Sequence, residues 1–432
     1  MTLRSEVPPW LAPRPSGLRV WALEPYHGGS HELFLQGLRG CSRHDIVEHT
    51  LPGRGWKWRM HGAALTFARR SFEELGDSDG PAAPAEAGPQ VLFVSDMLDL
   101  ATYRALAHPA AASAPAVLYM HENQLTYPLP EGVERDLGYG IKNVTAALAA
   151  ECVLFNSAYH RGEFLEALSR LVDAVPDAAP HWALEEVERR SRVLPVGCDL
   201  RRLDAQRPSV PSSRWGESSR GPLIVWNQRW EYDKAPGDLF RALYALKKRG
   251  IRFRLALAGA NHGHPTAEFV EAGERLAEEV VQWGRVESPE DYASLLWAAD
   301  VVVSTALHEF FGVAVVEALY CGCRPVLPHR LSYPEIVPRA AHDWALYGEG
   351  ELVPALERAV CEAGGACGEG PGARGEAPRF GDESSWSSLI EWQRTWVGRY
   401  DWATMGARYD AAIEECWEAG GVRRAARREV GR

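Results

Sequence analysis

The sequence predicts an α/β protein of two domains whose parallel sheets face a common cleft. Short apolar runs alternate with stretches of helical periodicity, which is the pattern of strands joined by crossover helices. The length of 432 residues fits about two domains. A segment rich in proline, serine and glycine, residues 206–222, interrupts the alternation near the middle of the chain.

We therefore expect an N-terminal tail, a first domain, a linker, a second domain, and a C-terminal helix with a basic tail, over residues 1–17, 18–204, 205–222, 223–395 and 396–432. The strands expected in the first domain are residues 18–23, 90–95, 116–121, 152–156 and 192–196. Those expected in the second domain are residues 223–226, 253–258, 280–283 and 301–305. Two low-complexity stretches, 77–88 and 364–383, are expected to be surface loops.

Composition excludes several classes of protein. A net charge of −11 argues against a surface that coats nucleic acid generally, although a local basic patch remains compatible with it. No run approaches about 18 apolar residues, so we expect no membrane-spanning helix. The first ten residues lack the apolar core of a signal peptide. The eight cysteines are scattered without a C-x-x-C pair, which favours reduced thiols in a cytoplasmic protein.

The most informative motif is a pair of glutamates, Glu309 and Glu317, that flank a glycine turn after an apolar strand. Eight residues return close to the same helical face, so a helix N-terminus is expected between the two acids. The free amides of Phe311, Gly312 and Val313 can face an anion there. Acids on either side of an anion site suit a sugar nucleotide; the alternative is an N-cap acid followed by a surface glutamate.

Two cations, Arg229 and Lys234, follow the strand at residues 223–226. Positive charges at the carboxyl end of a strand fit a diphosphate. Ordinary ion pairs on a surface loop are the alternative.

Two further segments leave strands of the first domain. Gly28 and Gly29 follow the first strand and permit close backbone approach to a ligand, although a plain tight turn explains them equally well. The polar run 121–124 follows the third strand. Polar side chains are costly inside a core, so we expect His121, Glu122, Asn123 and Gln124 to face the cleft.

Cations interleave with tryptophans at residues 56–59. Trp56 and Trp58 have the chemistry for stacking on unpaired bases, and Lys57 and Arg59 the charge for phosphates. Tryptophans that simply pack are the alternative. Because the chain is acidic, any basic surface must be concentrated, and the candidates are Arg54, Lys57, Arg59, Arg135 and Lys142.

Taken together, these motifs resemble a known group of enzymes. The two-domain layout, the Arg229–Lys234 pair and the Glu309–Glu317 pair are similar to retaining glycosyltransferases of the glycosyltransferase 4 group, which have the GT-B fold of two Rossmann-like domains. A closer resemblance, over about residues 20–338, is to the tRNA-queuosine α-mannosyltransferases. The segments that carry it are residues 25–31, 56–59, 121–124, 155–157, 229–234, 308–314, 320–323 and 333–336.

The resemblance implies a reaction and a set of roles. The donor would be GDP-mannose, and the acceptor would be the cyclopentenediol of queuosine at the wobble position of a tRNA anticodon. Arg229 and Lys234 would neutralise the diphosphate, and Glu309 would hold the sugar hydroxyls. The amides that follow it, including that of Phe310, would lie over the phosphate.

Glu317 would bind the ribose diol. His121 would lie beside the sugar, and Gly28 and Gly29 would approach the phosphate. The departing phosphate would accept the proton of the incoming hydroxyl. Acceptor contacts would come from Trp56, Lys57, Trp58, Arg59, Glu122, Asn123 and Gln124. No metal or other cofactor is expected, because fixed cations and helix amides take the place of a metal.

Other functions remain open at this point. A related glycosyltransferase could use another nucleotide sugar, such as a galactose donor, or a lipid or small-metabolite acceptor. A lipid acceptor predicts an amphipathic basic helix on the first domain, and none is clear in the sequence. A sugar epimerase or a nucleotide-sugar-binding protein without activity are further alternatives, although the residues needed for transfer are all present.

Overall fold

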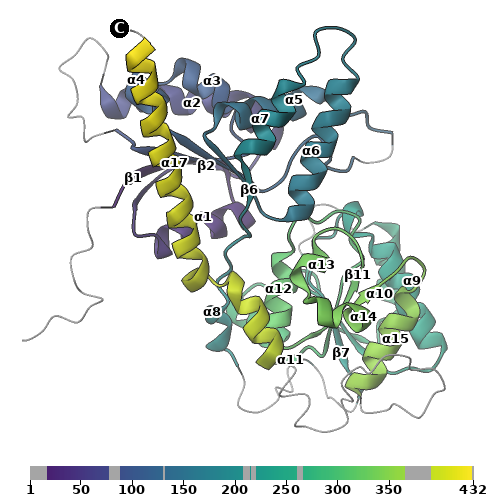
Figure 1. Ribbon diagram of the computed structural model, residues 1–432. Coiled ribbons are helices and arrows are strands. Elements are labelled where there is room, and N and C mark those ends of the chain that lie inside the picture. Colours follow the sequence, from purple (N-terminus) through teal and green to yellow (C-terminus); the bar gives the residue numbers. More distant parts are fainter. Residues whose placement is uncertain are drawn as a thin grey trace, which may run out of the picture.

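A computed structural model describes residues 17–76, 88–129, 132–207, 215, 220–259, 266–364 and 391–430, with side chains to residue 420. Apart from residues 17, 88 and 364, the predicted N-terminal tail and the predicted inserts at 77–88 and 364–383 lie outside these residues, as does most of the predicted linker. In Figure 1 the chain forms two lobes, and each lobe is built around a parallel sheet. The two-domain α/β architecture predicted from the sequence is confirmed.

The first sheet has the strand order β2-β1-β3-β4-β5-β6, and the second has the order β12-β11-β10-β7-β8-β9. All recorded pairings between the strands are parallel. The strands are β1 (Arg19–His27), β2 (Asp45–Pro52), β3 (Val91–Ser95), β4 (Ala116–Met120), β5 (Cys152–Phe155), β6 (Ser191–Val193), β7 (Leu223–Trp226), β8 (Arg254–Leu257), β9 (Val280–Trp283), β10 (Val301–Val303), β11 (Arg324–Pro328) and β12 (Leu346–Tyr347).

Helices cover both faces of each sheet. In the first domain they are α1 (Ser30–Cys41), α2 (Trp56–Leu75), α3 (Leu100–Leu106), α4 (Pro109–Ala112), α5 (Leu137–Ala149), α6 (Ala158–Asp173), α7 (Trp182–Arg190) and α8 (Arg201–Asp204). The remainder are α9 (Pro236–Lys248), α10 (Ala267–Arg275), α11 (Pro289–Ala298), α12 (Val313–Tyr320), α13 (Tyr333–Ile336), α14 (His342–Ala345), α15 (Leu352–Ala363) and α17 (Trp402–Val430), with short 3-10 turns η4 (Tyr232–Lys234), η5 (Arg339–Ala341) and η6 (Gly398–Tyr400).

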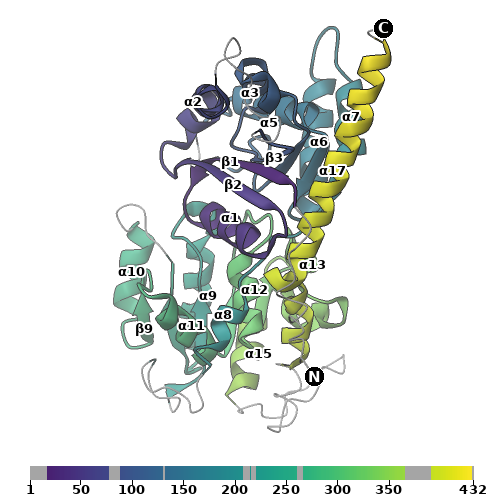
Figure 2. The same cartoon turned by 90° about the vertical axis from the view of Figure 1, so that its left-hand side faces the viewer.

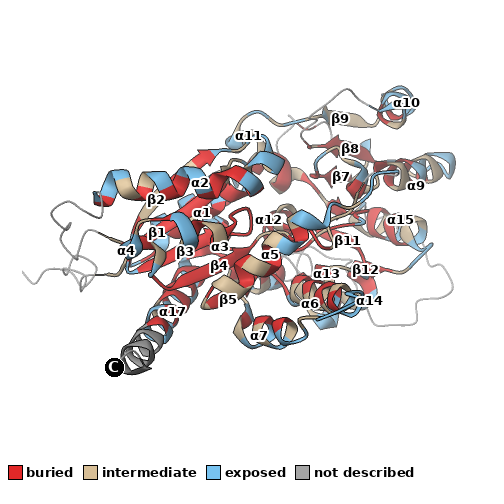
Figure 3. Ribbon diagram, turned by 90° about the horizontal axis from the view of Figure 1, so that it is seen from above, coloured by how far each residue is buried: buried red, intermediate tan, exposed pale blue. Residues whose placement is uncertain are grey.

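Burial explains why the central strands are continuous apolar runs. Val20 and Ala22 of β1 join one buried cluster, whereas Trp21 and Leu23, which point to the opposite face, join another. A parallel strand that is covered on both faces has no solvent side, so it shows no polar alternation. Figure 3 shows the result, with buried strands between helices that are exposed on their outer surfaces.

Two strand ends differ from the prediction by three residues or more. β1 continues to His27, beyond the predicted end at residue 23, because it remains paired with β2. β6 ends at Val193 rather than at residue 196. Pro195 has no N–H to donate to a ladder, and the chain leaves the sheet there and crosses to the second domain.

The chain returns across the same boundary near its C-terminal end. α17 begins at Trp402 and runs back along the first domain, as Figures 1 and 2 show. Its Asp410 accepts hydrogen bonds from the Ser42 hydroxyl at 2.6 Å and from the Arg43 amide at 3.1 Å. None of the described helices is both long enough and apolar enough to cross a membrane.

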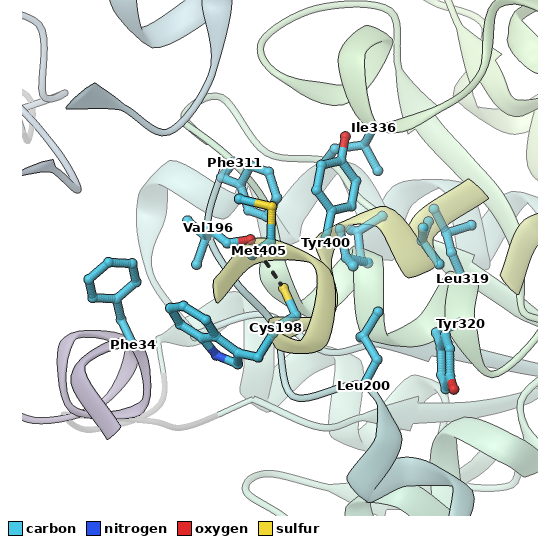
Figure 4. Close-up of a cluster of buried hydrophobic side chains, with 14 of the residues drawn as sticks. Phe34, Val196, Cys198, Leu200, Phe311, Leu319, Tyr320, Ile336, Tyr400 and Met405 are labelled. Atoms are coloured by element: carbon cyan, nitrogen blue, oxygen red, sulfur yellow. Dashed lines mark hydrogen bonds between the residues drawn. The ribbon is translucent and has the colours of Figure 1, made fainter. Parts of the chain in front are cut away.

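Where the chain crosses twice, the two segments are hydrogen-bonded to each other. The Cys198 amide donates to the Tyr400 carbonyl at 2.7 Å, and the Trp402 amide donates to the Cys198 carbonyl at 3.0 Å. Figure 4 shows the buried cluster around this point, in which Phe34 of the first domain and Leu319 of the second belong to the same core. The two domains therefore share one hydrophobic core.

Candidate active site

The turn that precedes α12 has the geometry expected for an anion site. Gly312 is the N-cap of this helix with a φ of 101°, in the left-handed region that favours glycine. A Cβ on Gly312 would lie 3.3 Å from the Ile336 side chain. The Phe311 amide makes only a long contact, 3.5 Å, with Glu309 Oε1. The amino end of α12 therefore begins directly beside the Glu309 carboxylate.

Lys234 is brought to this turn from the end of η4. Its Nζ donates to the His308 carbonyl at 2.7 Å and lies 3.4 Å from Glu309 Oε2 and 3.1 Å from Asp233 Oδ2. Burial acts to lower the pKa of Lys234, but Glu309 and Asp233 outweigh it and the pKa is raised. Lys234 is therefore a fixed positive charge.

Arg229 is half exposed, and its Nη1 lies 3.2 Å from Glu231 Oε1. Burial opposes its charge, yet Glu231 and Tyr127 raise the pKa of Arg229. The positive charge of Arg229 also acts to lower the pKa of Lys234. The structure thus brings together Arg229, Lys234 and Glu309, as the sequence predicted.

Glu317 is buried in the second turn of α12 and already has partners. Arg202 Nη2 lies 2.5 Å from one carboxylate oxygen, and the Tyr292 hydroxyl donates to the other at 3.1 Å. Asn227 donates to the same hydroxyl at 3.0 Å and to the Ala314 carbonyl at 2.8 Å. Burial raises the pKa of Glu317, and Arg202 opposes the shift. Arg202 was not predicted, because nothing in the sequence links α8 to α12.

In the first domain, β1 ends before the Gly28–Gly29 turn, and α1 begins after it. Gly29 has a φ of 57°, which glycine adopts without strain. Glu24 of β1 and His31 of α1 form a buried pair, with Oε2 and Nδ1 3.1 Å apart. Sequence reasoning treated this region as a glycine turn and missed that pair.

The His31 ring lies against His121, with ring centroids 4.2 Å apart. Burial alone would lower the pKa of His31, but Glu24, Asp96 and Glu122 raise it to about 9. Burial and the charge on His31 lower the pKa of His121 well below its ordinary value. At neutral pH the site therefore contains one imidazolium, His31, beside one neutral imidazole, His121.

The polar run after β4 divides into residues that face the site and residues that hold the loop. The Gln124 amide side chain donates to Glu122 Oε1 at 3.0 Å. Asn123 was predicted to face the acceptor, but it is fully buried. Its Oδ1 accepts from the amides of Leu125 and Thr126 at 3.1 and 3.0 Å. An asparagine that bonds the backbone two residues ahead stabilises a tight turn, so Asn123 shapes the loop from within.

Glu24, His31 and His121 place potential metal-ligand atoms within 4.8 Å of one another. Two imidazoles and a carboxylate are ligand types that bind divalent metals. Glu24 Oε1, however, already accepts from the Tyr26 amide at 2.8 Å and the Ser95 hydroxyl at 3.1 Å. The prediction that no metal takes part stays a prediction.

Several contacts bring the two sides of the site together. The Tyr127 ring lies 4.9 Å from that of His308 between centroids, and the Tyr232 hydroxyl donates to the Pro128 carbonyl at 2.6 Å. Glu335 of α13 accepts from the amides of Ala158 and Tyr159 at the start of α6, at 2.8 and 2.7 Å.

Phe310 and Phe311, predicted to bind the donor, have packed side chains. Phe310 stacks on His160 of the first domain, with centroids 3.8 Å apart. Phe311 meets Tyr400 edge-on in the shared core, as Figure 4 shows. Only their backbone groups are left for a ligand.

The tryptophan–cation motif forms the first turn of α2. Trp58 is 66% exposed and lies over Gly62, where a Cβ would come within 2.6 Å of the indole. The Trp56 ring lies 5.2 Å from Tyr139. Lys57 is exposed, whereas Arg59 donates twice to the Pro52 carbonyl at 3.2 Å.

Two of the predicted surface cations have internal partners. Arg135 donates to the carbonyls of Gln124 and Tyr127 at 2.8 and 2.7 Å, so it holds the polar loop in place. Lys142 pairs with Asp99 at 2.5 Å. The basic surface is therefore smaller than the sequence suggested, and Arg54 and Lys57 are its exposed members.

Comparison with known proteins separates the two halves. Residues 19–198 match the family model for the tRNA-queuosine α-mannosyltransferase N-terminal domain, and residues 212–349 match that for glycosyl transferases group 1. The chain is 34% identical over 322 residues to tRNA-queuosine α-mannosyltransferase of Drosophila melanogaster, covering 74% of this chain and 82% of the relative. It is 28% identical over 238 residues to GDP-mannose:cellobiosyl-diphosphopolyprenol α-mannosyltransferase of Xanthomonas oryzae pv. oryzae, covering 54% of each.

Solved structures agree on the fold. Sucrose-phosphate synthase of Thermosynechococcus elongatus superposes with a TM-score of 0.64 at 14% identity, over 93% of this chain and 100% of that one. The catalytic domain of starch synthase IV of Arabidopsis thaliana gives 0.64 at 13% identity, over 94% and 99%. The GT-B fold is thereby established, and this glycosyltransferase belongs to the tRNA-queuosine α-mannosyltransferase family.

Proposed function

We propose that the enzyme transfers mannose from GDP-mannose, with retention of anomeric configuration, to the cyclopentenediol of queuosine at the wobble position of a tRNA anticodon. The observation that carries this proposal is the match of the first domain, with its polar loop at 121–124 and its exposed Trp58, to the queuosine-specific family model. A tRNA acceptor implies a cytoplasmic site of action.

On the donor side, Arg229 and Lys234 neutralise the diphosphate while the amides at the start of α12 bind one of its phosphates. Glu309 accepts hydrogen bonds from sugar hydroxyls. The bond between the sugar C1 and the phosphate oxygen breaks, and a bond forms from C1 to the acceptor oxygen. The proton of the acceptor hydroxyl passes to the departing phosphate. Charges fixed before the reaction stabilise the developing negative charge without reorganisation, so no metal is required for this step.

Glu317 has a more restricted role in the proposal. Its carboxylate is held by Arg202 and Tyr292, so a ribose diol must share these partners or replace one of them. Binding of the donor is therefore coupled to the position of Arg202. This coupling affects ground-state binding rather than the chemical step.

On the acceptor side, neutral His121 lies beside the sugar, with Gly28 and Gly29 near the phosphate. The anticodon base is splayed out for reaction, as is usual in recognition of RNA loops. Trp58 offers an exposed surface for stacking, and Lys57 offers charge for phosphate. Trp56 supports this turn through Tyr139, and Arg59 supports it through Pro52.

The test is mass spectrometry of nucleosides from tRNA incubated with the enzyme and a panel of GDP- and UDP-sugars. A hexose on queuosine from GDP-mannose, and none on the same tRNA with guanosine at the wobble position, is the expected result. Unchanged labelling in EDTA is expected as well, whereas loss of activity that magnesium or manganese restores would contradict the metal-free mechanism.

The relative that acts on a cellobiosyl-diphosphopolyprenol defines a second arm of that experiment. Efficient transfer to such a lipid, with neither tRNA labelled, would replace the proposed acceptor. Equal labelling of both tRNAs would remove the requirement for queuosine.

A further inference from the structure

The acceptor side of the site holds three carboxyl groups and one imidazolium. Glu24, Asp96 and Glu122 come from three neighbouring strand ends, and His31 is the imidazolium that they share. Glu24 is well satisfied by His31, the Tyr26 amide and Ser95. The carboxyl groups that His31 does not pair with directly are therefore those of Asp96 and Glu122.

Asp96 is 1% exposed and follows β3 directly. Its Oδ1 accepts the His121 amide at 2.8 Å. Within the described part of the chain, Asp96 Oδ2 has no hydrogen-bond partner although it is buried. A buried carboxylate oxygen left in this state is costly, unless a donor from a bound molecule reaches it.

Glu122 is partly exposed, and a neighbouring residue of the same loop holds its side chain in place. Gln124 donates to its Oε1 at 3.0 Å. Asn143 connects this loop to Asp96, because it accepts the Gln124 amide at 2.8 Å and donates to the Asp96 carbonyl at 2.9 Å. Hydrogen bonds thus connect the loop that carries Glu122 to Asp96, and Glu122 is the more exposed of the two carboxyl groups. The positive charge of Arg229, from the second domain, acts on Glu122. Arg229 also forms an ion pair with Glu231.

We propose that Glu122, backed by Asp96, is the counter-ion for a protonated secondary amine of the acceptor. The inference rests on the proposed function. In queuosine a secondary amine joins the cyclopentenediol ring to the base, and an amine of this type is protonated at neutral pH. A hydroxyl of that ring placed against the sugar beside His121 brings the ammonium next to Glu122, the following residue. Guanosine lacks both the secondary amine and the cyclopentenediol. The contact between the ammonium and Glu122 therefore favours queuosine over guanosine.

The test compares two small ligands with the full-length protein and GDP in a calorimeter. One is the cyclopentenediol carrying an N-methylamino group, which is cationic, and the other is its neutral N-acetyl derivative. Charge-assisted hydrogen bonds predict that the wild type binds the cation about tenfold to a hundredfold more tightly. Glu122→Gln should reduce this ratio to near one while leaving affinity for the neutral ligand unchanged. Asp96→Asn should reduce it less, because the raised pKa of Asp96 keeps this carboxyl group largely protonated near neutral pH.

Glu166→Gln is the matched control, because this glutamate lies on α6 of the same domain with a 65% exposed side chain. It should keep the wild-type ratio. A ratio unchanged in Glu122→Gln, with a melting temperature near that of the wild type, would overturn the proposal. So would one equivalent of a divalent metal in the purified protein by elemental analysis, because the cluster would then be a metal site.

The outcomes separate this inference from the proposed function. Binding that depends on Glu122, together with no labelling of queuosine tRNA, would retain an amine site and reject the tRNA reaction. Labelling of queuosine tRNA, with a ligand ratio insensitive to Glu122→Gln, would retain the reaction and reject the amine site.

Discussion

The two domains contribute different ionisable groups to the candidate site. The second domain presents Arg229 and Lys234 beside the amino end of α12. The first domain presents Glu24, Asp96 and Glu122 around a single imidazolium. The second domain matches the model for glycosyl transferases group 1, whereas the first matches the model for the N-terminal domain of tRNA-queuosine α-mannosyltransferase. We therefore expect the features that distinguish this family mainly in the first domain.

The largest expected effect is on the free energy of unfolding, and it comes from the buried carboxyl group of Asp96 in the first domain. Burial, followed by Glu122 and Glu24, raises the pKa of Asp96 to about 8, with His31 opposing. Between the unfolded value near 3.8 and this folded value, the native state holds a proton that the unfolded chain has released. Stability therefore falls as pH rises through this window. As pH rises through this window, the free energy of unfolding of the wild type should fall by several kcal/mol relative to that of the Asp96→Asn variant.

Denaturant unfolding at several pH values measures this loss, with exposed Asp173→Asn as the control. The raised pKa of His31 acts in the same direction, because its contribution is present below about 6.5 and is lost as pH rises through about 9. Parallel curves for wild type and Asp96→Asn from pH 5 to 8 would show that the cluster is not strained by its charge.

The next largest expected effect is on kcat/KM, and it comes from Arg229 of the second domain. Arg229→Ala should lower kcat/KM by about 100-fold or more, because a charge aimed at the departing phosphate acts most strongly in the transition state. Steady-state kinetics with queuosine tRNA measures it. Arg241→Ala, whose side chain is 72% exposed in the same domain, should behave as wild type. Equal losses in the two variants would remove Arg229 from the reaction.

Recognition of RNA should depend on the first turn of α2. Trp58→Ala is expected to weaken tRNA binding by about tenfold, since stacking of one base contributes roughly 1–3 kcal/mol. Trp182 on α7 is exposed to a similar extent, 62%, and supplies the control. Filter binding at fixed salt is sufficient for the comparison, and identical affinities for the two alanine variants would place the anticodon elsewhere.

Glu317→Gln should act mainly on donor affinity, with KM for GDP-mannose rising about fivefold to tenfold and kcat changing little. A contact made equally in the ground and transition states has this signature. Glu357→Gln is the control on α15. A pure loss of kcat would contradict the ribose assignment.

The smallest effect is electrostatic. Lys57→Ala should reduce the slope of log affinity against log salt by about one, because one phosphate contact releases about one counterion. Lys248→Ala, on the exposed end of α9, should leave the slope unchanged. A slope that Lys57→Ala does not alter would show that this cation does not contact phosphate.

Much of the fold was predictable because the buried strands are apolar runs between glycine, proline and helical stretches. β2 escaped notice because it is an edge strand whose Glu48 and His49 interrupt the apolar pattern. Asp96 could have been found, since it follows a buried strand as His121 does. Arg202 could not, because its pairing with Glu317 joins residues 115 apart, and no local pattern encodes such a contact.

The paired crossing segments at Cys198 and Tyr400 have a mechanical consequence. A single tether would let one lobe twist and swing in any direction relative to the other. Two tethers hydrogen-bonded side by side, with Trp402 packed against Gly197, resist that twisting. We expect the paired crossing to limit how far the candidate site residues of one lobe can turn away from those of the other.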